Sequence, residues 1–160
     1  MLSRPQANQF VTIHLAKILE NVAQFFQYEF QQRSIAFILD NKFPDIVIYG
    51  NENQIKQVFI NLIKNAMEAI VDDGTITLEV CPSMDYKEIF IGLKDTGSGI
   101  PPEVLKRMFE PFYTTKTKGT GLGMMIIKKI IQDHNGKIKI KSQEDIGTEI
   151  LLSFPIVQPS

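Results

Sequence analysis

Two glycine-rich segments hold the residues of this chain whose types and spacing are best suited to chemistry. The first, Asp95 to Ile100, sets a carboxylate beside two closely spaced glycines, and the second, Gly119 to Gly123, opens onto an apolar helical pattern. Glycines leave backbone N–H groups accessible, and a helix N-terminus favours anions. The connection between the segments is rich in threonine and lysine, including Lys116 and Lys118. Together these features are typical of a polyphosphate-binding site.

A helix predicted from Glu52 to Val71 presents a polar arc that could complete this site. At about 100° per residue its apolar residues gather on one broad side. Asn61, Lys64, Asn65 and Glu68 fall on a narrow polar side. Asparagine is a mediocre helix former, so two asparagines one turn apart indicate a side-chain function. A merely solvated helix face is the alternative that this pattern leaves open.

The elements that must position these residues follow from hydrophobic periodicity and turn residues. Ile35 to Leu39 and Ile46 to Tyr49 flank a polar, proline-containing stretch, which predicts a hairpin. Asn51 is the predicted cap of the long helix, and a short helix is expected to begin at Pro101 or Pro102. The other predicted elements are a strand over Phe10–Leu15, a helix from Ile18 to Phe30, strands over Thr75–Cys81 and Glu88–Lys94, a helix over Leu122–Asp133, and strands over Lys137–Ser142 and Thr148–Phe154.

These elements predict a single α/β domain. We expect a two-layer sandwich in which a mixed, largely antiparallel sheet of about five strands carries the main helices, about three of them, on one face. A length of 160 residues suits one domain of ordinary size. The domain is expected to span residues 10–156, with residues 1–9 as an N-terminal remnant or linker and residues 157–160 as a frayed tail.

Composition excludes several classes of protein. With 17 basic and 18 acidic residues, the chain shows no electrostatic footprint for nucleic acid or for a polybasic membrane patch. Cys81 is the only cysteine, so an internal disulfide is impossible, and the lack of a histidine or cysteine cluster excludes a structural zinc site. No apolar run reaches the ~20 residues that cross a bilayer, and the N-terminus lacks the regions of a signal peptide. We therefore expect a soluble, cytoplasmic module without direct membrane insertion.

Several familiar nucleotide-binding motifs are absent. A Walker A motif needs Gly-Lys-Ser/Thr, but Gly136 and Lys137 are followed by Ile138 in a strand pattern. A Rossmann motif must follow a strand directly, whereas Thr114 to Lys118 is polar, and the last glycine of Gly119 to Gly123 is misplaced for that motif. The His-Arg-Asp and Asp-Phe-Gly signatures of eukaryotic-type protein kinases are also missing.

Four other motifs occur in order: Asn61–Ala66, Asp95–Ile100, Phe109–Tyr113, and the run of Gly119, Thr120, Gly121, Leu122 and Gly123. They resemble the N box, first glycine box, F box and second glycine box of the catalytic ATP-binding domain of sensor histidine kinases. Heat-shock chaperone ATPases, type II topoisomerases and mismatch-repair ATPases share this superfamily, but the chaperones and topoisomerases lack the F box. The resemblance covers Phe10 to Phe154, looks most like the nitrogen-regulation and sporulation-type kinases, and implies the Bergerat ATP-binding fold with a lid over residues 101–118.

The resemblance implies an adenine pocket around Asp95. The carboxylate would accept a hydrogen bond from the exocyclic amine of adenine, whereas guanine presents an acceptor there, a mismatch of about 1–3 kcal/mol in favour of ATP. Gly97 and Gly99 would let the backbone approach the base, and Ile100 would line the pocket. The same pattern places Thr148 near the adenine, with a plain strand threonine as the alternative.

The resemblance also implies magnesium. Asn65 is the expected metal ligand, a neutral hard oxygen beside the triphosphate, and Asn61 faces the same site. Chaperone and mismatch-repair relatives carry a glutamate at the position of Asn61, where it activates water for hydrolysis. An amide has no basic site for that proton, so we expect phosphoryl transfer to be favoured over hydrolysis. The expected cofactors are ATP and Mg²⁺.

Which cation contacts the phosphates is left open. Some sensor kinases place a lysine three residues after the magnesium asparagine, where this chain has Glu68. Lys64, Lys116 or Lys118 could substitute, with Lys116 as the candidate catalytic cation beside the two asparagines; solvated lysines are the alternative. The backbone of Gly119 to Gly123 is expected to bind nucleotide, and Glu68 either orients magnesium-bound water or is merely solvated.

Neither His14 nor His134 lies in the sequence context of a phospho-accepting histidine. We therefore predict that the chain presents ATP to a histidine on a separate dimerisation domain, in cis or in trans, and acts indirectly on a response regulator. The isolated chain is expected to be monomeric and to bind no nucleic acid. Two alternatives stay open: an ATP-driven hydrolase or clamp of the same superfamily, and a nucleotide-sensing module or serine kinase without histidine chemistry.

Overall fold

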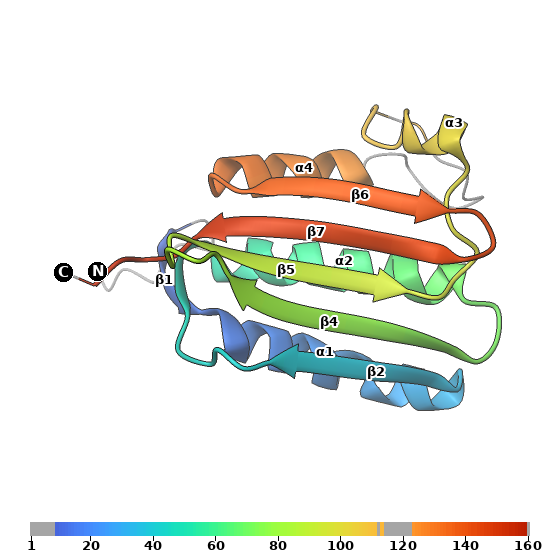
Figure 1. Ribbon diagram of the computed structural model, residues 1–160, viewed down its shortest axis with the longest axis horizontal. Coiled ribbons are helices and arrows are strands. Elements are labelled where there is room, and N and C mark those ends of the chain that lie inside the picture. Colours follow the sequence, from blue (N-terminus) through green and yellow to red (C-terminus); the bar gives the residue numbers. More distant parts are fainter. Residues whose placement is uncertain (1–8, 112, 114–122, 160) are drawn as a thin grey trace, which may run out of the picture.

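The computed structural model describes residues 9–111, 113 and 123–159. Helices are interspersed among the strands along this part of the chain, as Figure 1 shows. Their bounds are β1 Val11–His14, α1 Leu15–Gln32, β2 Ile35–Asn41, β3 Val47–Gly50, α2 Glu52–Ala69, β4 Gly74–Pro82, β5 Glu88–Asp95, α3 Pro102–Leu105, α4 Gly123–Asp133, β6 Lys137–Gln143 and β7 Gly147–Pro155.

Five strands form the main sheet in the order β2-β4-β5-β7-β6 (Figure 1). Strands β4, β5, β7 and β6 pair antiparallel with their neighbours, whereas β2 pairs with β4 in parallel. A separate two-stranded antiparallel sheet joins β1 to β3. The predicted mixed, largely antiparallel sheet of about five strands is therefore confirmed.

The predicted hairpin between Ile35–Leu39 and Ile46–Tyr49 is wrong. The first run belongs to β2 at one edge of the main sheet, and the second belongs to β3, which pairs with β1. Local bonds turn the chain between them: the Phe43 N–H donates to Asn41 Oδ1 (2.9 Å), and the Ile46 N–H donates to the carbonyl of Phe43 (3.4 Å). Two adjacent β-branched runs indicate strands but do not choose their partners, because that choice depends on which faces the whole fold can bury.

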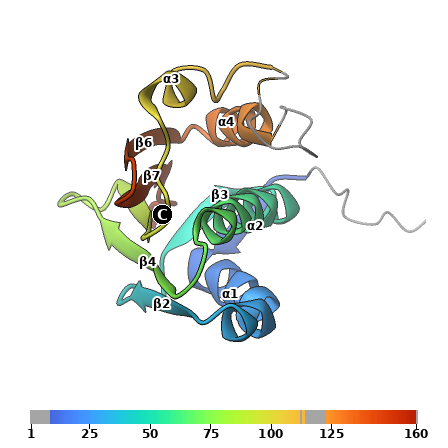
Figure 2. The ribbon, with the colours of Figure 1, turned by 90° about the vertical axis from the view of Figure 1, so that its right-hand side faces the viewer.

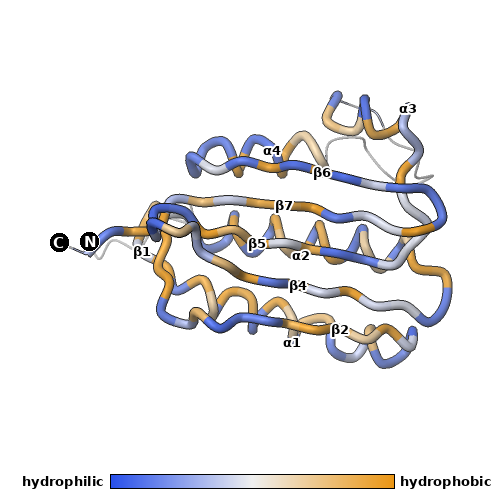
Figure 3. Tube along the Cα trace, in the orientation of Figure 1, coloured by the Kyte–Doolittle hydropathy of each residue, from blue (hydrophilic) through white to orange (hydrophobic). Residues whose placement is uncertain are grey.

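The main helices α1, α2 and α4 lie on one side of the main sheet, as predicted (Figure 2). The turns of α2 alternate between hydrophobic and hydrophilic residues in Figure 3, as expected for a helix with one face on a core. Each large side chain that is fully buried contributes about 1.5–3 kcal/mol. Burial of the apolar face of α2 therefore fixes the direction in which its polar arc points. The buried residues of α2 are Ile55, Val58, Phe59, Leu62, Ile63, Ala66 and Met67.

Both ends of α2 have identifiable causes. At the start, the Gln54 N–H donates to Asn51 Oδ1 (3.0 Å), which confirms the predicted cap. At the end, Ile70 is already extended, so the helix stops at Ala69, two residues before the predicted Val71. An Arg33 guanidinium N–H donates to the Ile70 carbonyl (3.0 Å), which satisfies one acceptor where the helix ends.

Candidate functional site

The polar arc of α2 forms one wall of the candidate site. Asn61 and Asn65 are partly buried, whereas Lys64 and Glu68 are exposed. The Asn65 side-chain N–H donates to the sulfur of Met124 (3.7 Å), a residue in the first turn of α4. The two asparagines therefore do not lie on a fully solvated face, and the amide of Asn65 is oriented by a neighbouring helix.

Asp95 ends β5 as a buried carboxylate that is 6% exposed. Its Oδ1 accepts the N–H of Gly97 (2.8 Å), and its carboxylate also accepts the backbone N–H of Thr148. Burial raises the pKa of Asp95 above its ordinary value of 3.8, while these two N–H groups act in the opposite direction. The chain thus keeps an acid in a place that disfavours its charge, which is typical of a functional group.

The glycine turn after Asp95 is wedged between two other parts of the chain. A Cβ at Gly97 would lie 2.7 Å from the Cβ of Ala69, the last residue of α2, and the Ser98 N–H donates to the Ala69 carbonyl (2.9 Å). Gly99 has a φ of +76°, and a Cβ there would collide with the carbonyl oxygen of Gln143. Both glycines therefore allow close approach to protein backbone, and they join the turn to α2 on one side and to β6 on the other.

Ser142 holds the far side of this turn, and the sequence did not indicate it. Its Oγ accepts the Ile100 N–H (2.7 Å), donates to the Gly147 carbonyl (3.1 Å) and lies 2.8 Å from Thr148 Oγ1. Thr148 is buried, at 7% exposure, and pairs with Asp95 across β5 and β7. The available signal was a break in pattern, because Ile138 and Ile140 predict that position 142 should continue an apolar face.

The described part of the predicted lid makes few buried contacts. Helix α3, Pro102–Leu105, is a single short turn with no buried residue, and it begins at Pro102 as predicted. The ammonium of Lys128 in α4 lies 5.0 Å from the centre of the Phe109 ring, a cation–π distance. Arg107 and Glu110 pair at 3.1 Å with both side chains more than half exposed, so this pair contributes little stability.

The structure brings most of the described site residues to one end of the sheet. Asp95, Gly97, Gly99, Ile100 and Thr148 form one connected group through the bonds above, and Ala69 ties that group to the helix that carries the two asparagines. Gly123 opens α4, and no atom of the described residues lies within 4 Å of the position of a Cβ there. The remaining predicted residues, which lie outside the described part of the chain, are Lys116, Lys118, Gly119, Thr120, Gly121 and Leu122.

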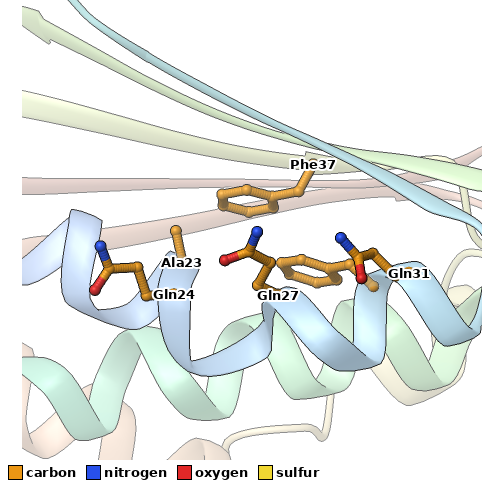
Figure 4. Close-up of a pocket in the computed structure, with 6 residues that line it drawn as sticks. Ala23, Gln24, Gln27, Gln31 and Phe37 are labelled. Atoms are coloured by element: carbon orange, nitrogen blue, oxygen red, sulfur yellow. The ribbon is translucent and has the colours of Figure 1, made fainter.

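A groove of about 290 Å³ lies elsewhere, between α1 and the edge strand β2 (Figure 4). The rings of Phe30 and Phe37 stack there with centres 4.8 Å apart, and three glutamine side chains line the rim. None of the residues that line it in the described part of the chain is a predicted site residue. The lining residues are Ala23, Gln24, Gln27, Phe30, Gln31 and Phe37.

The family of the chain follows from comparison with known proteins. Residues 50–158 match the family described as histidine kinase-, DNA gyrase B-, and HSP90-like ATPases. The chain belongs to this family. Among curated members, sporulation kinase A of Bacillus subtilis is 40% identical over 156 residues, and the sensory histidine kinase/phosphatase NtrB of Azospirillum brasilense is 36% identical over 158 residues. These matches cover 97% and 88% of the chain, which spans only 25% and 38% of the two relatives.

Solved structures of this family share the fold. The nucleotide-free catalytic domain of histidine kinase ThkA superposes with a TM-score of 0.82 at 32% identity, covering 92% of this chain and 97% of that one. ThkA in complex with the response regulator protein TrrA gives a TM-score of 0.78 at 29% identity, covering 92% of this chain and 42% of that one. By sequence and by fold the chain is therefore a histidine-kinase-type catalytic domain, and the predicted sporulation-type and nitrogen-regulation resemblance is confirmed.

Two kinds of feature are absent from the described residues. No cluster of histidine, cysteine, aspartate and glutamate side chains in that part of the chain could hold a metal ion by itself. No helix among the same residues is both long enough and apolar enough to cross a membrane.

Proposed function

We propose that this chain binds Mg-ATP and presents its γ-phosphoryl group to a histidine on a dimerisation domain, in cis or in trans. The observation that carries the proposal is the buried carboxylate of Asp95 at a turn that packs on the end of α2. The turn that follows Asp95 is thus hydrogen-bonded to the end of the helix that carries the amides of Asn61 and Asn65. Such an arrangement can hold both ends of one nucleotide in a fixed relation, which is the main protein contribution to phosphoryl transfer.

In this proposal Asp95 reads the adenine. Its carboxylate accepts the exocyclic N–H of adenine, while Ile100 and Thr148 line the same pocket. The Ser142 hydroxyl bonds both of these residues, which supports a preformed pocket at this end of the sheet. Guanine would set an acceptor against the carboxylate, and an unmatched buried acceptor costs about 1–3 kcal/mol.

Asn65 is the proposed magnesium ligand. An amide oxygen is a hard neutral ligand, and magnesium in nucleotide sites is typically held by one or two protein groups together with phosphates and waters. The donor set of α2 fits this use because Asn65 is partly buried and its amide is oriented by Met124. Glu68, three residues later, would orient bound water. Bound magnesium supplies neutralisation of the charge on the phosphates.

The phosphates are proposed to contact backbone N–H groups of Gly119 to Gly123 and one of the lysines Lys64, Lys116 or Lys118. Lys64 is exposed on the polar arc of α2, one residue before Asn65. Residues 101–118 would act as the lid over the nucleotide. The family membership of the chain and the direct continuity of the glycine segment with α4 support this arrangement.

Asn61 supports transfer over hydrolysis. It lies one turn before Asn65 on the same arc of α2. An amide cannot accept and hold the proton of an attacking water, so water near the phosphates would stay unactivated. We propose that the γ-phosphoryl group is thereby kept for a protein acceptor.

The acceptor is proposed to be a histidine outside this chain. His134 is 3% exposed, and hydrogen bonds engage both of its ring nitrogens. His14 is exposed at the start of α1, without the context of an acceptor. The complex of the related ThkA with a response regulator supports a response regulator as the next protein in the pathway. We further expect a cytoplasmic location and a monomeric isolated chain.

Calorimetric titration with ATP and GTP, each with and without magnesium, tests the proposal. We expect ATP to bind more tightly than GTP by about tenfold or more, and magnesium to strengthen ATP binding. Asp95→Asn should abolish the preference for ATP. Asp85→Asn, at an exposed aspartate in the turn between β4 and β5, is the matched control and should bind like wild type. No heat from Mg-ATP and well-folded protein would refute the proposal.

A phosphate-release assay separates transfer from hydrolysis. We expect the chain alone, supplied with Mg-ATP, to show no steady-state release of phosphate and no incorporation of label. Sustained release would instead favour the hydrolase alternative.

A further inference from the structure

His134 is buried where α2 begins and α4 ends, and its hydrogen bonds determine which ring nitrogen carries a proton. The backbone N–H of Asn51 donates to Nε2 (3.0 Å), and Nδ1 lies 2.7 Å from the Ile130 carbonyl oxygen. A backbone N–H can only donate, so Nε2 carries no proton. Nδ1 must then carry the proton and donate to the carbonyl. The ring is therefore a neutral imidazole with both nitrogens engaged.

The imidazole bridges two helices. Asn51 caps α2 through its side chain and accepts the Ile55 N–H at its carbonyl (3.0 Å), so whatever holds Asn51 holds the first turn of α2. Ile130 lies in the last turn of α4. One side chain thus joins the start of α2 to the end of α4.

The surroundings allow the ring little movement. Phe10 stacks on it with ring centres 4.5 Å apart, and Phe154 meets it edge-on at 6.4 Å. On another side lies Gly50, where a Cβ would collide with His134 Cδ2. A ring packed this closely transmits a displacement of one helix to the other, because well-packed interiors deform little.

The same two helices meet again at the candidate site, through the contact of Asn65 with Met124 at 3.7 Å. Asn65 lies 14 positions after Asn51, so the two contacts are about 20 Å apart along α2 at 1.5 Å per residue. Two polar contacts therefore join α2 to α4, one at the start of α2 and one at the candidate site.

We propose that His134 is a positioning residue: by holding the start of α2 against the end of α4, it sets the orientation of Asn65 for magnesium-dependent binding of ATP. The inference rests on the proposed role of Asn65 as magnesium ligand. It assigns no contact between His134 and nucleotide. Recognition of adenine by Asp95, at the turn after β5, should not depend on it.

Two substitutions at His134 separate positioning from packing. The amide of His134→Gln reaches the position of Nε2 and keeps an acceptor for the Asn51 N–H. The shorter amide of His134→Asn reaches only the position of Nδ1, so it keeps the bond to Ile130 within α4 and loses the bridge to α2. Both variants lose the aromatic ring, so a role limited to packing of the ring would affect them alike.

The measurement is the affinity for ATP in magnesium and in EDTA, by calorimetry on the whole chain. We expect His134→Asn to lose about tenfold of the magnesium-dependent gain, a coupling of ordinary size, with ATP affinity in EDTA unchanged. His134→Gln should stay within about threefold of wild type. Equal losses in both variants, or no loss in His134→Asn, would overturn the inference. If wild type itself fails to bind Mg-ATP, the proposed function fails instead.

A second measurement needs no variant and covers the case in which His134→Asn does not fold. Nitrogen-15 NMR of the wild-type imidazole should show a protonated Nδ1 and an unprotonated Nε2 near neutral pH, before and after addition of Mg-ATP. The opposite tautomer, or rapid exchange between tautomers, would mean that the bridge to Asn51 does not hold and would overturn the inference.

Discussion

Asp95 and His134 are both buried polar residues, yet they serve opposite purposes. Asp95 ends β5 and His134 follows α4, and these two element ends lie at opposite sides of the domain in Figure 1. Each accepts at least one backbone N–H. They differ in how much of their hydrogen-bonding capacity the protein itself uses. Both ring nitrogens of His134 are engaged, whereas a carboxylate offers roughly four lone-pair sites, of which the Gly97 and Thr148 N–H groups occupy only part.

This difference shows that burial of a polar group does not by itself identify a site. A group whose hydrogen-bonding capacity is used up inside the protein stabilises the fold, and its loss should appear as lost stability. A buried group with capacity to spare, held at an electrostatic cost, is suited to a ligand. The raised pKa of Asp95 is the sign of that cost.

Replacing His134 by alanine should give the largest change and tests the scaffold side of this comparison. The substitution leaves the buried Asn51 N–H without its acceptor and opens a cavity beside Phe10, so we expect a loss of about 3 kcal/mol in the free energy of unfolding. For a domain of this size that corresponds to a fall of about 6–12 °C in the melting temperature, measurable by calorimetry or circular dichroism.

His14→Ala is the matched control, because His14 is exposed and its side chain caps nothing. It should change the free energy of unfolding by less than about 0.5 kcal/mol. If the two alanine variants melt at the same temperature, the hydrogen bonds of His134 contribute nothing to the free energy of unfolding. The structural role given to His134 in this comparison would then be wrong.

The contrast between these histidines was only partly visible in the sequence. Neither lies in the context of a phospho-accepting histidine, so the sequence predicted no acceptor role for either of them. Which one is buried depends on Phe10, Gly50 and Phe154, which are distant in sequence and meet only in the fold. Local pattern therefore could not predict the bridging position of His134.

The same limit explains the rest of the sequence predictions. The cap at Asn51, the strands at β6 and β7 and the amphipathic helix α2 depend on neighbours within a few residues, and all are confirmed. The partner of β2 and the bonds of Ser142 depend on strands far along the chain, and these were missed. The roles given to Asp95 and Asn65 stay predictions, supported by their placement.

A pH series tests the ligand side of the comparison. The pKa of Asp95 is raised in the folded chain, so the folded state holds a proton more tightly than the unfolded state from pH 3.8 up to the raised pKa. Stability from this group therefore falls as pH rises through that window. ATP binding has the opposite dependence, because the ionised carboxylate is the better acceptor for the adenine amine. As pH falls through the raised pKa, we expect ATP affinity to fall by about tenfold.

Asp95→Asn isolates this effect from other titrating groups, including those of ATP itself. The asparagine variant should lack the Asp95 component in both profiles, measured by calorimetric titration and by denaturant unfolding over the same pH values. Identical profiles for wild type and Asp95→Asn would mean that protonation of the carboxylate does not affect ATP binding. The ligand-binding role that distinguishes Asp95 from His134 would then be wrong.

Ser142→Ala should give the smallest change. It tests whether Ser142 contributes to ligand binding, as proposed for Asp95, or only stabilises the fold. Ser142 is at the candidate site, like Asp95, but its hydroxyl bonds only protein groups in the structure described above, like His134. Alanine leaves the Ile100 N–H without that acceptor. Because the site is only partly buried and water can replace the hydroxyl, we expect about 1 kcal/mol of lost stability.

The informative readout for Ser142→Ala is whether ATP affinity falls with stability. Ser142 holds Ile100 and Thr148 on the proposed adenine pocket, so we expect a loss of about two- to fivefold in affinity, equal with and without magnesium. Ser83→Ala removes a comparable hydroxyl network in the exposed turn between β4 and β5 and should leave ATP affinity unchanged. If a Ser142→Ala variant loses stability but binds ATP like wild type, Ser142 stabilises the fold, as His134 does, and does not contribute to the adenine pocket. ATP recognition would then depend on Asp95 and not on the bonds of Ser142.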